Sequence, residues 1–144
     1  MKKYLFALLA LVLMVSPALA APVVGEAAPL FTGKDSNGKD ITLADLKGKI
    51  VVLEWSNHEC PFVKKHYESN NMQTLQKKSA ADGVTWLTVL SSAEGKQGNV
   101  DAATANQLAT ERGAAPAAII MDPSGDIGRL YQAKTTPHMF VIDK

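Results

Sequence analysis

Cysteine is scarce in this sequence, in which Cys60 is the single one among 144 residues. One cysteine excludes an internal disulfide, and it equally excludes a pair of cooperating thiols within the chain. An excess of one charge is missing too, because 15 basic residues stand against 14 acidic ones. The balance gives no reason to expect a nucleic-acid partner. After residue 20 no apolar run approaches the roughly 20 residues needed to cross a bilayer.

The first twenty residues are laid out like an export signal. Lys2 and Lys3 precede an apolar run from Tyr4 to Val15, and the stretch ends in the A-x-A pattern of Ala18–Ala20. A retained membrane anchor is the rival interpretation, but the run is short for that role. We therefore predict cleavage after Ala20, export to a periplasm, and no membrane contact once the signal is removed. The predicted domains are a signal peptide over 1–20 and one folded domain over 21–144.

Strand and helix patterns alternate along the rest of the chain. Asn37-Gly38 predicts a hairpin turn. Compact apolar runs predict strands at 50–55, 84–90, 117–121 and 139–143, and the segments between them predict helices at 62–78, 100–113 and 127–133. The alternation is typical of an α/β fold with a central, mostly parallel sheet and helices on both faces. Because the chain ends directly after a predicted strand, we expect the domain to be incomplete at its C-terminal end.

Two motifs carry a resemblance to a known group of proteins. One is the stretch GKDITLADLKGKIVVLEW followed by Cys60-Pro61, and the other is TTPHMFVID near the end. Together they resemble the thioredoxin-like superfamily, in particular the redoxin branch that includes the alkyl hydroperoxide reductase/thiol-specific antioxidant family. The resemblance implies a thioredoxin-like fold with Cys60 as the reactive thiol. It also implies that Thr136 and Pro137, joined by a cis peptide bond, form the opposing loop that holds an extended substrate.

The sequence departs from both well-known active sites of this superfamily. Val63 stands where a Cys-x-x-Cys motif has its second cysteine. The Pro-x-x-x-Thr-x-x-Cys signature of peroxiredoxins is also broken, since Leu53 and Asn57 replace its proline and threonine. The residues therefore support a redoxin-like protein more strongly than any one named activity.

The surroundings of Cys60 predict a reactive thiol. Pro61 suits the first position of a helix, which makes Cys60 the N-cap, where the helix dipole favours a thiolate. We expect His58, Glu59 and Lys64 to tune the pKa of the thiol, with Glu59 acting against ionisation. The alternative is a buried, inert cysteine that serves as a small hydrophobic residue.

Histidines near the thiol allow a second interpretation. Cys60, His58 and His138 form a set of ligands that suits copper, whereas His66 falls on another side of the predicted helix. Such histidines more often make hydrogen bonds, and we expect neither a metal nor another cofactor.

The leading hypothesis is an exported thioredoxin-like thiol oxidoreductase that acts through Cys60 on peroxide or protein thiols. As an enzyme it would be a thiol-dependent peroxidase or a thiol–disulfide oxidoreductase with antioxidant activity. Its partner would be an external thiol or a cysteine beyond residue 144, because an oxidised Cys60 finds no second thiol within the 144 residues. The alternatives are a copper- or thiol-binding carrier and a redox-inactive module that binds peptides. The sequence leaves the oligomeric state open.

Overall fold

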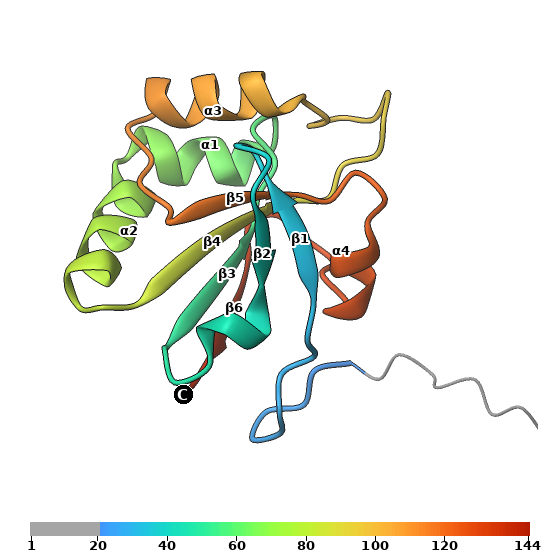
Figure 1. The fold of residues 1–144 in the computed structure, drawn as a ribbon. Helices are drawn as coiled ribbons and strands as arrows, with labels where there is room; N and C mark the ends of the chain where they lie inside the picture. Colours follow the sequence, from blue (N-terminus) through green and yellow to red (C-terminus); the bar gives the residue numbers. More distant parts are fainter. Residues whose placement is uncertain (1–20) are drawn as a thin grey trace, which may run out of the picture.

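The computed structural model describes residues 21–144, so the predicted signal peptide lies outside the described part of the chain. This part forms a six-stranded sheet in the order β2-β1-β5-β4-β3-β6 (Figure 1). The strands are β1 Thr32–Asp35, β2 Asp40–Thr42, β3 Val51–Trp55, β4 Thr85–Leu90, β5 Ala118–Met121 and β6 His138–Ile142. The helices are the 3-10 turn η1 Leu43–Leu46, then α1 Pro61–Glu68, α2 Asn71–Ala81, α3 Ala102–Glu111 and α4 Asp126–Leu130.

The directions of the strands differ from the expected pattern. The pairs β3–β4 and β4–β5 are parallel, while β1–β2, β1–β5 and β3–β6 are antiparallel. The sheet is mixed, and the prediction of a mostly parallel sheet was wrong. The reason lies partly in the connection from β5 to β6. A parallel strand needs a crossover that returns the chain to the opposite end of the sheet. Here the connection stays at one end, and β6 starts with His138 beside Trp55, the last residue of β3.

Helices cover both faces of the sheet, as predicted, and each face has its own core. On one face the cluster includes Leu53, Trp55 and Tyr131, and it lies under η1 and α4. On the other face Val52 and Trp86 pack against residues of α1 and α2. The strand β3 is buried along its whole length, because both of its faces are covered. Figure 1 shows α1, α2 and α3 on one side of the sheet and α4 on the other.

The long helix predicted over 62–78 is in fact two helices. α1 ends at Glu68, and α2 begins at Asn71 after a break. Asn70 lies in the break with a φ of 58°, a left-handed conformation that asparagine tolerates better than most residues. Its N–H donates to the carbonyl of Tyr67 over 3.1 Å. The break turns the chain, so that α2 packs along β4 while α1 stays beside the end of β3.

The last described strand, β6, pairs only with β3 among the described strands and forms one edge of the sheet. Val141 on this strand is 73% exposed. Incompleteness of the domain after Lys144 stays a prediction. Within residues 21–144 there is no helix with the length and apolarity required to cross a membrane.

Candidate thiol site around Cys60

The fold places Cys60 at the start of α1, immediately after the loop that leaves β3. Pro61 is the first helical residue and Cys60 is the N-cap, as predicted. The loop before it is held by Asn57, whose side-chain oxygen accepts from the N–H of Glu59 over 2.9 Å. The carbonyl of Asn57 accepts from the N–H of Cys60 over 3.0 Å. This tight turn explains how the chain passes from a buried strand to a half-buried thiol within five residues.

A second loop faces the thiol. The bond between Thr136 and Pro137 is cis, which confirms the conformation implied by the resemblance. Pairing of β3 with β6 brings this loop next to the start of α1. The thiol of Cys60 donates a hydrogen bond to the carbonyl of Thr136 over 3.0 Å. The structure thus brings together Cys60, Thr136 and Pro137, the three residues that the sequence motifs associate.

The pKa of Cys60 is lowered from its usual value. Burial works against the charged form, while Thr136 and the backbone N–H groups of Val63 and Phe62 favour it. The bond from the thiol to the carbonyl of Thr136 exists only while the sulfur is protonated. The lowering therefore comes from the side chain of Thr136 and, after it, from the N–H groups in the first turn of α1, which an anion at the N-cap can accept from. The direction agrees with the sequence-based prediction.

The three residues expected to tune this pKa lie around the loop and have other contacts. The Glu59 carboxylate accepts from the N–H of Gly98 over 2.6 Å and so anchors a neighbouring loop. The carbonyl of His58 accepts from Arg112 over 2.9 Å. Lys64 is exposed one turn into α1. The tuning role of all three residues stays a prediction.

The histidines are not gathered around the sulfur. Nδ1 of His138 is bonded to the N–H of Lys134 over 3.3 Å, and its ring packs on Phe140 with 4.5 Å between centroids. Nδ1 of His66 meets the side-chain amide of Asn71 over 2.9 Å. Among residues 21–144, no three histidine, cysteine or acidic side chains are grouped so that they could hold a metal ion. The alternative of a copper site at Cys60, His58 and His138 therefore gains no support from the geometry.

Sequence reasoning missed a carboxylate beneath the site. Glu54 lies on β3 with 0% of its surface exposed. Its oxygens accept from four side chains, namely Tyr67 (3.2 Å), Gln76 (3.2 Å), Trp86 (2.9 Å) and Thr88 (3.2 Å). The signal that could have revealed it is a single acidic residue inside the apolar run IVVLEW.

Burial sets the protonation of this carboxylate. Desolvation raises the pKa of Glu54, and the hydrogen bonds from Trp86, Gln76, Thr88 and Tyr67 only partly oppose the increase. Burial and the neighbouring Glu54 also raise the pKa of Tyr67. Tyr67 belongs to the core cluster against which Cys60 packs. Cys60 therefore packs against the same cluster that supplies Tyr67 and Trp86 to the polar network.

Arg112 is the other residue that the sequence did not single out. It is the C-cap of α3, and its guanidinium lies over the ring of Tyr67 at 5.4 Å from the centroid. Its bond to the carbonyl of His58 ties the end of α3 to the loop that carries Cys60. Its own carbonyl accepts from the side chain of Gln73 on α2 over 2.7 Å. Arg112 at the end of α3 thus contacts α1 through Tyr67 and α2 through Gln73. It also binds the segment from Asn57 to Cys60, the thiol loop, through the carbonyl of His58.

A comparison with protein families matches residues 24–144 to the model described as the AhpC/TSA family. The chain belongs to the AhpC/TSA family. A comparison with curated proteins finds no match.

Solved structures similar to this AhpC/TSA member share the thioredoxin-like fold. An uncharacterized conserved protein from Geobacillus kaustophilus has a TM-score of 0.73 and 23% identity, over 83% of this chain and 62% of that one. A putative thiol:disulfide interchange protein DsbE from Chlorobium tepidum has a TM-score of 0.64 and 26% identity, over 83% and 77%. An exposed lipoprotein thioredoxin from Streptococcus pneumoniae has a TM-score of 0.60 and 24% identity, over 81% and 82%. The chain therefore spans less than two thirds of the Geobacillus protein.

Within this AhpC/TSA chain, both departures from well-known active sites have a structural role. Val63 has 0% of its surface exposed and packs in the core beside Cys60. Asn57 closes the turn that leads to the thiol, and Leu53 is fully buried in the opposite core. The site consequently presents one sulfur, a helix start and a facing carbonyl.

Proposed function

We propose that this protein is an exported thiol oxidoreductase in which Cys60 reacts with peroxide or with protein thiols, and in which an external thiol completes the cycle. The observation that carries the proposal is the position of Cys60. Its sulfur is half-buried at the start of α1, has a lowered pKa, and meets the carbonyl of Thr136. A low-pKa, accessible thiol is the kind that reacts, whereas a structural cysteine is inert.

The peroxide reaction uses the thiolate as nucleophile. The sulfur attacks one oxygen of the peroxide, the O–O bond breaks, and the leaving alkoxide or hydroxide takes up a proton. Cys60 becomes a sulfenic acid, oxidised by two electrons, and the peroxide becomes an alcohol or water. The thiolate fraction sets the rate at neutral pH, so the N–H groups at the helix start favour the reaction.

The second half of the cycle needs sulfur from outside this chain. An external thiol displaces water from the sulfenic acid and forms a mixed disulfide with Cys60. A second external thiol then attacks this disulfide, which restores Cys60 and releases the oxidised partner. Because Cys60 is the only cysteine among residues 1–144, these residues need a small thiol or a protein thiol as co-substrate. The same mixed disulfide would form directly if Cys60 attacked a disulfide in a protein.

Trapping of the intermediate tests this proposal. The protein is treated with one equivalent of hydrogen peroxide in the presence of dimedone and analysed by mass spectrometry. We expect one adduct on Cys60 in the wild type, no adduct in Cys60→Ser, and sustained peroxide consumption only when a thiol is added. If the wild type forms neither an adduct nor a mixed disulfide with an added thiol, the oxidoreductase proposal fails. A carrier or a redox-inactive peptide-binding module would then be the better explanation.

Export is proposed on the residues that precede the described domain. Lys2, Lys3, the apolar run and Ala18–Ala20 support it, as does the similarity to a pneumococcal lipoprotein described as exposed. Expression of the whole chain in a Gram-negative host should place the protein in the periplasmic fraction with Ala21 at its N-terminus. An N-terminus at Met1 in the cytoplasmic fraction would contradict export.

A further inference from the structure

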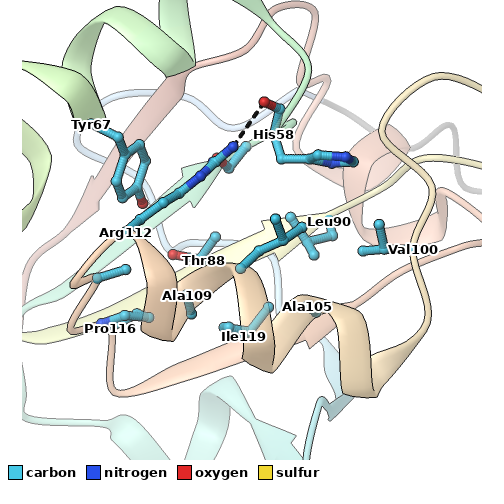
Figure 2. Close-up of a pocket in the computed structure, with 13 residues that line it drawn as sticks. His58, Tyr67, Thr88, Leu90, Val100, Ala105, Ala109, Arg112, Pro116 and Ile119 are labelled. Carbon is cyan, nitrogen blue, oxygen red and sulfur yellow. Dashed lines mark hydrogen bonds between the residues drawn. The ribbon is translucent and has the colours of Figure 1, made fainter.

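A cavity lies on the α3 side of the sheet, separate from the sulfur of Cys60. Figure 2 shows it between the sheet-facing side of α3 and residues of β4 and β5, with Arg112 and Tyr67 at one end. His58 also lines the cavity, and its carbonyl is bonded to Arg112 (Figure 2). Cys60 itself is not part of the lining.

The cavity has a cationic end. The guanidinium of Arg112 donates one hydrogen bond, to the carbonyl of His58, although a guanidinium carries five donors. No carboxylate within residues 21–144 forms an ion pair with it. The hydroxyls of Tyr67 and Thr88 at this end already donate to Glu54. The charged group available to a ligand here is therefore the remaining face of a guanidinium that has no ion-pair partner among residues 21–144.

Two further polar residues, Ser56 and His58, belong to the lining, and the rest of the lining is apolar. It is formed by Leu90, Val100, Ala105, Leu108, Ala109, Ala114, Pro116 and Ile119. The small side chains of Ala105 and Ala109 leave space between α3 and the sheet. An inorganic anion has no hydrocarbon part to bury against this wall. A cation with a hydrocarbon chain would be repelled by the positive charge of Arg112. An anion with a short hydrocarbon chain suits both ends.

The size of the cavity limits the length of that chain. About 50 Å³ is open to the centre of a water-sized molecule. One water occupies roughly 10–15 Å³ in this measure, so this space holds about three to five groups of the size of a water or a methylene. A long fatty acid or a peptide segment exceeds this space, while a short free acid fills it.

We propose that this cavity binds a short-chain monocarboxylate. The carboxylate pairs with the free face of the Arg112 guanidinium, which is suited to hold two oxygens at once. The hydrocarbon chain lies against Ala109 and Ile119. The proposal does not depend on the redox function, because no atom of Cys60 takes part in binding.

Titration with butyrate provides the test, with binding followed by calorimetry and by the amide NMR signals of α3. We expect saturable binding to the wild type and at least about tenfold weaker binding to Arg112→Leu, since the charged hydrogen bonds are lost. Ala109→Leu should also remove binding, because its larger side chain fills the cavity. Ala103→Leu, on the exposed side of α3, and Arg129→Leu, whose cation pairs with Asp126, are the matched controls and should bind like the wild type.

Two ligand controls separate the contributions of charge and chain. Chloride at equal ionic strength tests a bare anion, and butylamine keeps the chain but reverses the charge. Neither should produce the shifts seen with butyrate. Absence of saturable butyrate binding, or equal affinity for the wild type, Arg112→Leu and Ala109→Leu, overturns the proposal. Absence of butyrate binding is measured on the wild type alone. The proposal can therefore be refuted even if a cavity variant fails to fold.

Discussion

The thiol of Cys60 and the carbonyl of Thr136 lie 3.0 Å apart although 76 positions separate them in the chain. The contact joins the start of α1 to the loop before β6. It holds the protonated sulfur in place beside the half-buried residues Thr136 and Pro137. We therefore expect a substrate that reaches Cys60 to approach along the loop of Thr136 and Pro137.

The first prediction concerns the reactivity of Cys60. Because its pKa is lowered, the rate of alkylation by iodoacetamide should rise with pH around a midpoint below about 8.5, the value of a free cysteine. The same protein in guanidinium chloride is the control and should have its midpoint near that value. A folded-state midpoint equal to or above the denatured one would contradict the prediction.

The second prediction treats Arg112 as a positioning residue for the thiol loop. Arg112→Leu removes the bond to the carbonyl of His58 while keeping an apolar side chain beside Tyr67. The loosened loop should let Cys60 leave the helix start, and its pKa should rise by up to about one unit. Alkylation at pH 7 would then slow by up to about tenfold.

Two further variants show whether that effect is specific. Arg112→Lys keeps the charge without the planar fork, and it should fall between Arg112→Leu and the wild type. Arg129→Leu removes an exposed arginine of α4 and should leave the midpoint of Cys60 alkylation unchanged. If Arg112→Leu lowers only the melting temperature and leaves the midpoint in place, the residue is structural and the prediction fails.

The third prediction concerns pH and the stability of the fold. Desolvation raises the pKa of buried Glu54, so between the unfolded value near 4.5 and the higher folded value the folded state binds more protons. The contribution of Glu54 to the free energy of unfolding is therefore present at low pH and is lost as pH rises through the folded-state pKa. Each unit of difference corresponds to about 1.4 kcal/mol.

Urea unfolding of the wild type and of Glu54→Gln at several pH values from 4 to 8 measures this contribution. The difference in unfolding free energy between the two proteins should change with pH, with the wild type losing stability relative to the variant as pH rises. Groups common to both proteins cancel in this difference. A difference that stays constant with pH would show that Glu54 has the same protonation in the folded and unfolded chains.

The fourth prediction concerns the missing second cysteine. Val63 lies three residues after Cys60, is fully buried, and packs beside it. Val63→Cys should allow an internal disulfide, so diamide should remove both free thiols in the variant. Lys65→Cys, an exposed position of α1 on a different side from Cys60, is the control and should keep its thiols or form only intermolecular bonds. Retention of two free thiols in oxidised Val63→Cys would exclude the expected geometry at the helix start.

Several elements followed from the sequence because their causes are local. Asn37-Gly38 supplies the turn between β1 and β2, where Gly38 has a φ of +80°. Pro61 starts α1 and leaves Cys60 as the N-cap, because a residue without an N–H fits the first helical position. The apolar runs marked β3, β4, β5 and β6 within one or two residues of their observed bounds.

The tertiary structure alone decided the features that depend on distant segments. The antiparallel direction of β6 follows from where its connection lies, which no local pattern encodes. Glu54 is satisfied by side chains 13 to 34 positions away, and Arg112 reaches the thiol loop across 54 positions. Residue type and local spacing thus determined the approximate bounds of four strands and the start of α1, with Cys60 at its N-cap. Long-range packing decided which polar groups surround that sulfur, because only the folded chain fixes which distant side chains share a low-dielectric interior.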